Sequence, residues 1–157
     1  DLLKFNEEKK REDLKSEEKK QDIKKEKEAS TENIRQLKEA IELSIGNNSD
    51  HNIIIEFCEN VLINELRPLI DKYKKLISDH GVIILCAKKG DKLSFLIGVT
   101  DQLTDKIGAD EIAKFASSIS NGKGGGGRKD FAQSGGMLIN EDDQKRELRK
   151  FIIGKLQ

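Results

Sequence analysis

Hydrophobic residues are distributed unevenly along the chain, and two segments with different patterns meet at residue 46. Acidic and basic side chains dominate residues 1–45, which contain no proline or glycine, and this composition favours a helix. After Phe5 the only large apolar residues for about six helical turns are Leu14 and Ile23, too few for the seam of a coiled coil. We therefore predict a charged helical arm over 1–46, which acts as a connector or supports a homodimer.

The end of this arm carries a tighter apolar stripe, formed by Ile34, Leu37, Ile41 and Ile45. Its helical spacing predicts that this part of the arm docks on a neighbouring element. The turn-forming sequence "GNNSD" over 46–50 is then expected to end the helix.

Residues 47–157 show the mixed strand and helix patterns of a small α+β domain. A short β-branched run predicts a buried strand over 52–58. Two more strands, 82–88 and 92–99, are joined by Lys-Gly-Asp, which is a hairpin signal. The expected fold is a small mixed sheet with flanking helices behind the helical arm.

Three helices are predicted between and after these strands. The first has Pro68 in its first turn and Gly81 as its stop, with His80 as a C-cap. The second, of about ten residues, turns an apolar face inward, and the third starts at about Glu141, after a short strand or turn over 137–139. The inward residues of the second helix are Ile112, Phe115, Ala116 and Ile119.

Composition adds three limits to this picture. At 35% hydrophobic and 37% charged, the 157 residues are too polar for a single compact globule, so part of the chain should lie outside the core. Lys+Arg 29 balance Asp+Glu 29, so attraction to a nucleic acid must come from a local patch. The chain lacks an initial methionine, and we expect it to be a piece of something longer.

The cysteines and apolar runs indicate a cytoplasmic protein. Cys58 and Cys86 both lie in apolar runs, which favours buried, reduced thiols over a disulfide framework. No apolar run approaches the ~20 residues that cross a bilayer, so no membrane partner is expected. With His51 and His80, these cysteines have none of the close paired spacings of a zinc site, so we predict no metal site.

The segment "SNGKGGGGRKDFAQSGG" over 120–136 holds seven of the thirteen glycines. Such a concentration costs backbone entropy and favours either positive φ angles or a close approach to the main chain. Three of these glycines fit the dinucleotide pattern G-x-G-x-x-G, but the segment follows a helix instead of a strand. Gly122-Lys123 also lacks the serine or threonine of a triphosphate-binding loop.

The side chains around these glycines favour a phosphate-bearing partner. Lys123, Arg128 and Lys129 flank main-chain N–H groups that can surround an anion, while Gln133 and Ser134 add hydrogen-bonding reach. Three basic residues on one face of the last helix either extend this patch or only compensate the helix dipole. They are Arg146, Arg149 and Lys150.

The segment "GKGGGGRKDFAQSGG", preceded by "LIGVTDQLTDKIGADEIAKFASSI", resembles the C-terminal domain of the alanyl-tRNA synthetases, a DHHA1-type domain. Members show a Gly-Gly-Gly-Arg-Pro-Asp-x-Ala-Gln-x-Gly-Gly signature after the same strand, turn and helix. The resemblance runs from about Asn52 to the C terminus. Two departures are Lys129, where the family usually has proline, and one additional glycine among 124–127.

This resemblance implies a tRNA-binding module of an alanine–tRNA ligase, without catalytic residues or a cofactor of its own. In the family the domain engages the tRNA elbow, where the D and T loops meet, and helps couple aminoacylation with editing. A helical arm joins it to the editing domain. The expected nucleic-acid-binding residues are Lys123, Gly124, Gly125, Gly126, Gly127, Arg128, Lys129, Gln133, Ser134, Arg146, Arg149 and Lys150.

Several alternatives remain open from the sequence. The same domain occurs as the substrate-binding half of phosphoesterases, whose catalytic half carries an Asp-His-His motif that this chain lacks. A helix-mediated dimerisation module is another possibility, weakened by the sparse seam. Asp130 either contributes to binding or braces its turn, and Phe131 either belongs to the core or stacks on an exposed base.

Overall fold

One mixed sheet of five strands organises the computed structural model, which describes residues 31–45, 52–77 and 80–156. The predicted α+β class is confirmed. Residues 31–44 are helical. The elements that follow are β1 (Asn52–Glu59), α2 (Ile63–Leu76), β2 (Gly81–Lys89), β3 (Lys92–Val99), a 3-10 helix (Asp101–Leu103), α3 (Ala109–Ser118), β4 (Gly125–Gly127), β5 (Phe131–Met137) and α4 (Glu141–Leu156).

The strand order is β1-β2-β3-β5-β4, so β1 and β4 form the two outer edges. β1 and β2 are parallel because α2 forms the crossover between them, and the remaining neighbours are antiparallel. The hairpin predicted at Lys-Gly-Asp is confirmed, with Gly90 at a φ of 61°.

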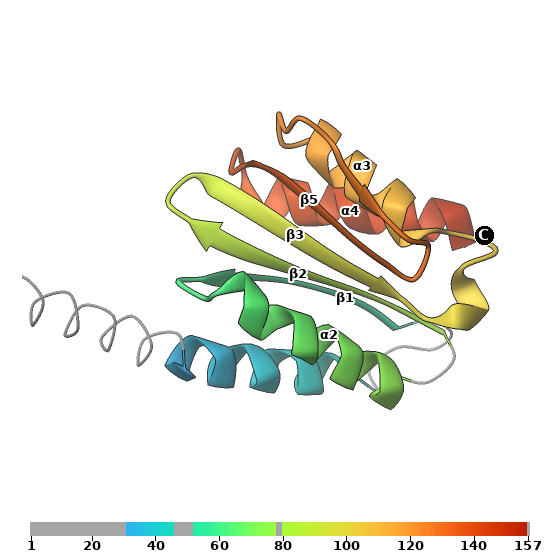
Figure 1. Ribbon diagram of the computed structural model, residues 1–157, viewed down its shortest axis with the longest axis horizontal. Coiled ribbons are helices and arrows are strands. Elements are labelled where there is room, and N and C mark those ends of the chain that lie inside the picture. The colour runs from blue at the N-terminus through green and yellow to red at the C-terminus, as the bar shows by residue number, and fades with distance from the viewer. Residues whose placement is uncertain (1–30, 46–51, 78–79, 157) are drawn as a thin grey trace, which may run out of the picture.

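Helices cover both faces of the sheet (Figure 1). α3 and α4 pack on one face, where Phe95 and Ile97 of β3 point, while α2 and helix 31–44 pack on the other, where Leu96 points. Burial from both sides explains why β2 is almost continuously hydrophobic. The predicted inward face of α3 is confirmed, with Ile112 and Ala116 fully buried.

The apolar stripe of helix 31–44 docks on the sheet as predicted. Leu37 and Ile41 are 4% and 0% exposed and belong to the core cluster that includes α2. Tyr73 of α2 donates a hydrogen bond from its hydroxyl to Glu42, at 3.2 Å. The charged part of the arm over 1–30 and the turn over 46–50 lie outside the described residues, so the proposed connector or homodimer stays a prediction.

The first predicted helix has different ends in the structure. α2 begins at Ile63, so Pro68 lies inside the helix and not in its first turn. The sequence pattern missed the first turn of the helix because Ile63 and Asn64 are exposed and precede the apolar stripe, which begins at Leu66. At the other end Ile77 is the C-cap, and Gly81 begins β2. The expectation that His80 caps the helix is therefore wrong.

The glycine-rich segment is the largest departure from the predicted elements. It forms β4 and most of β5, whereas a short strand or turn was expected only over 137–139. Glycine has low strand propensity and provides no alternating pattern. The pairing comes from tertiary context, because β3 presents an open edge to β5.

Candidate nucleic-acid interface

β4 and β5 form an antiparallel hairpin that presents the glycine-rich segment at an edge of the sheet. Gly125 lies opposite Ser134, and Gly127 lies opposite Ala132. The Arg128 N–H donates a 2.8 Å hydrogen bond to the carbonyl of Phe131, which closes the turn. Because β4 is the outermost strand, one of its two backbone edges has no partner strand in the described sheet.

Close packing within the protein explains several of the glycines. A Cβ at Gly122 would lie 2.0 Å from the carbonyl oxygen of Gly135, and one at Gly136 would lie 2.4 Å from Cβ of Ser120. Cβ atoms at Gly125 and Gly127 would both meet the backbone of β5 at less than 3.0 Å. These glycines allow β4, β5 and the end of α3 to pack together.

Gly126 differs from its neighbours in β4. A Cβ there would meet no atom within 4 Å, so neither packing nor steric exclusion requires a glycine. Its φ also lies outside the positive region, unlike that of Gly124, which is +100°. The fold therefore accounts for Gly124 but leaves Gly126 as an open stretch of main chain.

A hollow of about 290 Å³ lies beside Gly126. Arg67 reaches it from α2, and its guanidinium carbon lies 4.8 Å from the centroid of the Phe131 ring. Phe131 packs against the core cluster below and lies under this guanidinium group, so that face of the ring is covered. The hollow is lined by Arg67, Gly126, Gly127, Arg128, Phe131, Ala132 and Gln133.

The basic side chains next to β4 are exposed to solvent. The Arg128 side chain is 73% exposed, with its Nε 3.4 Å from a carboxylate oxygen of Asp130. An exposed pair of this kind contributes little to stability and leaves the guanidinium accessible to a partner. Lys123 and Lys129 are also exposed, and no ion pair to either is found among the described residues.

Asp130 braces its turn through its main chain. Its carbonyl accepts a 3.0 Å hydrogen bond from the N–H of Val99 and a 3.1 Å hydrogen bond from Nζ of Lys74. Its carboxylate contacts Arg128. The turn that carries Arg128 is thus fixed to β3 and α2.

Gln133 and Ser134 point in opposite directions, as neighbours in a strand do. Gln133 is exposed and lines the hollow. The Ser134 hydroxyl is buried and has no hydrogen-bond partner in the part of the chain that the structure describes. The expectation that Ser134 reaches a ligand from the surface does not fit this geometry.

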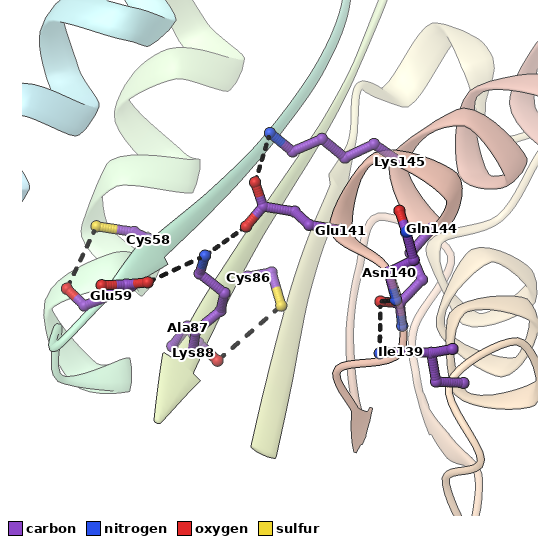
Figure 2. Close-up of polar contacts among 10 residues, drawn as sticks. All are labelled: Cys58, Glu59, Cys86, Ala87, Lys88, Ile139, Asn140, Glu141, Gln144 and Lys145. Carbon is purple, nitrogen blue, oxygen red and sulfur yellow. Dashed lines mark hydrogen bonds and ion pairs between the residues drawn. The ribbon is translucent and has the colours of Figure 1, made fainter. Parts of the chain in front are cut away.

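The basic residues of α4 lie near the opposite edge of the sheet. Figure 2 shows the beginning of α4 tied to the end of β2, where Glu141 contacts Lys88 and Lys145. Burial raises the pKa of Glu56 in β1, and the positive charges of Lys145 and Arg149 oppose this. Arg149 therefore lies by β1, whereas the glycine-rich hairpin includes β4 at the far edge.

Arg146 and Lys150 share the helix face of Arg149 and have acidic neighbours of their own. Arg146 contacts Asp143, and Nζ of Lys150 lies 4.0 Å from Glu147. The prediction that these three α4 residues could extend the glycine-rich surface is therefore not supported, because they belong to a different side of the domain. Their alternative assignment, a solvated helix end, fits the structure.

Arg67 is the residue that sequence reasoning missed. It is one of several charged residues on the exposed side of an amphipathic helix, and no spacing in the sequence links it to the glycines. The only available signal was the aromatic residue inside the signature, since arginine stacks readily on aromatic rings.

The two cysteines are buried thiols, away from the candidate interface. Cys58 and Cys86 are free and buried, as predicted, and burial raises the pKa of both thiols. Within the described ranges, no three His, Cys, Asp or Glu residues are placed to share a metal ion. The helices described there are all too short or too polar to traverse a bilayer.

Comparison with known proteins places the chain in a domain family. Residues 50–157 match the DHHA1 domain family. In the solved structures, a crystal structure of the C-Ala domain from Aquifex aeolicus alanyl-tRNA synthetase is similar, with a TM-score of 0.59 and 34% identity. That match covers 70% of this chain and 95% of the other.

Curated relatives extend the comparison to whole proteins. The alanine–tRNA ligase of Parvibaculum lavamentivorans is 36% identical over 104 residues, which are 66% of this chain and 12% of the ligase. The Francisella tularensis alanine–tRNA ligase is 38% identical over 117 residues, which are 74% of this chain and 13% of that ligase. The chain thus spans only about an eighth of the length of these relatives.

Proposed function

Because the chain belongs to the DHHA1 domain family, in the form that occurs as the C-terminal domain of alanyl-tRNA synthetases, we propose that it is a tRNA-binding module. The observation that carries this proposal is the exposed edge formed by β4 and its flanking turn. There an open glycine, Gly126, lies next to an accessible guanidinium group, that of Arg128.

The chemistry of this edge suits a phosphate backbone. Arginine offers a planar set of donors that pairs with phosphate oxygens, and exposed main chain allows a strand of RNA to approach closely. The chain has a formal net charge of +0, so the attraction must arise locally, and Lys123 and Lys129 supply further charge beside Arg128. We propose that phosphate contacts of this kind provide most of the affinity.

Within the parent ligase, we propose that the domain engages the tRNA elbow and helps couple aminoacylation with editing. Its own contribution is binding and positioning, without a cofactor and without a chemical step. The relatives reported above are ligases or a ligase domain, which favours this role over the substrate-binding half of a phosphoesterase.

Substitution of Arg128 tests the proposal. Arg128→Ala should weaken tRNA binding by about 1.5–3 kcal/mol, the scale of a hydrogen bond to a charged group. Binding is measured with the complete chain and a tRNA transcript at fixed salt. Arg146→Ala is the matched control, because it removes an exposed arginine from α4 and should change the affinity little. Equal affinities for both variants and the unaltered chain would remove Arg128 from the interface.

A further inference from the structure

The hollow between α2 and β4 brings together a second arginine and the open glycine. Arg67 comes from α2, outside the glycine-rich signature, and lines the hollow with Gly126 and Arg128. We propose that this hollow seats one phosphate group of the RNA backbone, held between the guanidinium groups of Arg67 and Arg128. This inference rests on the proposed function, since it assigns a new contact to the same binding surface.

The position of the Arg67 side chain supports this assignment. Asp71 lies four residues further along α2, at a spacing where helical ion pairs form. In the part of the chain that the structure describes, Arg67 makes no ion pair with it or with another carboxylate. Its guanidinium lies over Phe131 instead, at 4.8 Å from the ring centroid.

Phe131 acts as a positioning residue in this arrangement. A cation–π contact attracts the Arg67 guanidinium group to the ring, and the group carries a planar set of N–H donors. Donors of this kind pair with phosphate oxygens. Because Phe131 is anchored against the core cluster, the guanidinium is held in place before the RNA arrives.

Gly126 supplies the second line of argument. Gly125 and Gly127 are required by contact with β5, but a Cβ at Gly126 would meet no protein atom within 4 Å. The space that a Cβ would fill there is open, next to the hollow. A glycine at this position keeps the main chain accessible to a sugar–phosphate backbone.

Variants of Arg67 test this phosphate clamp, by which we mean the pair of guanidinium groups of Arg67 and Arg128. Arg67→Ala should weaken tRNA binding about 10-fold and lower the slope of log affinity against log salt by about one phosphate contact. Arg67→Lys keeps the charge but loses the fork and the stacking, and should recover only part of the affinity. The control Lys72→Ala removes a charge from the same helix, where Lys72 lies over Tyr73, outside the hollow.

Two further variants separate the clamp from other roles of Arg67. Phe131→Leu should weaken binding only where Arg67 is present, so its effect should vanish in the Arg67→Ala background. Gly126→Ala should leave the unfolding midpoint unchanged and weaken tRNA binding several-fold. A lower unfolding midpoint for Gly126→Ala would contradict the open environment assigned to Gly126.

The outcomes distinguish the two proposals. If the unaltered chain binds tRNA and Arg67→Ala behaves like Lys72→Ala, the clamp is wrong while the tRNA-binding function stands. If Arg67→Lys binds as tightly as the unaltered chain, Arg67 acts only as a general charge and the assigned phosphate seat is overturned. If the unaltered chain does not bind tRNA, the proposed function fails and the clamp fails with it.

Discussion

Gly122 and Gly126 lie four residues apart, yet their surroundings differ. A side chain at Gly122 would collide with the carbonyl of Gly135 inside the protein, whereas one at Gly126 would project into open space. Internal packing therefore explains part of the glycine content of this segment, while Gly126 leaves its stretch of main chain open.

This contrast predicts stability effects of different size for the same substitution at the two positions. Gly122→Ala should destabilise the fold by about 1–3 kcal/mol, because its Cβ lies 2.0 Å from a backbone oxygen and strands must shift to admit it. Gly126→Ala should change the free energy of unfolding by less than about 0.5 kcal/mol. Urea denaturation of both variants provides the comparison, and equal stabilities would contradict the packing assigned to Gly122.

The sequence predicted candidate site residues within the signature, but it could not predict features that depend on three-dimensional packing. Lys123, Arg128 and Gln133 are exposed, as contact with a partner would require. Ser134 points inward because neighbouring strand residues alternate, which required knowing that the segment forms a strand. Arg67 reaches the hollow from another element, so no local pattern announces it.

At the scale of elements, Tyr73 joins helix 31–44 to α2. Its side chain is fully buried, and its hydroxyl donates to Glu42. Burial, reinforced by the negative charge of Glu42, raises the pKa of Tyr73 from 10.0 to about 12. The neutral phenol is thus favoured by the folded state.

The single tyrosine of the chain makes this shift directly measurable. Tyrosinate absorbance should show a midpoint near 12 in the folded protein and near 10 in denaturant. Since the folded-state pKa is raised, the stabilisation is complete below the unfolded-state value and is lost as pH rises from about 10 towards 12. Tyr73→Phe should lack this contribution to alkaline unfolding.

A folded-state midpoint near 10 for Tyr73 would contradict the docking of helix 31–44 described above. Glu42→Gln provides the control, because it removes the charge next to the phenol while keeping an acceptor. Its tyrosinate midpoint should fall between the value of the unaltered chain and that of the denatured protein.

Strands with apolar patterns were predictable from sequence, whereas strands made of glycine were not. β1, β2 and β3 have continuous β-branched or apolar runs, and each appears close to its predicted position. β4 consists of three glycines, and its pairing depends on β5. Pro68 was misplaced for a related reason, since α2 begins before its apolar stripe does.

For the whole molecule, the balance of charges matters more than their number. Lys+Arg 29 and Asp+Glu 29 cancel overall, and on α4 acidic neighbours accompany Arg146 and Lys150. At the edge of β4 the basic side chains include Arg67, for which no acidic partner is found among the described residues. This local excess is what the proposed function requires.

The chain matches one domain of its longer relatives. It covers 12% and 13% of two curated ligases but 95% of a solved C-Ala domain. Binding and positioning of tRNA is the role we propose for this domain.

The salt dependence of tRNA binding tests this account most directly. Affinity of the complete chain for a tRNA transcript should fall steeply as salt rises, because each neutralised phosphate releases counterions. Contacts from Arg67, Arg128 and the two flanking lysines should give a log–log slope of about −3 to −4. A tRNA affinity that stays constant across the salt series, or no measurable binding at low salt, would contradict the phosphate-binding edge on which the account depends.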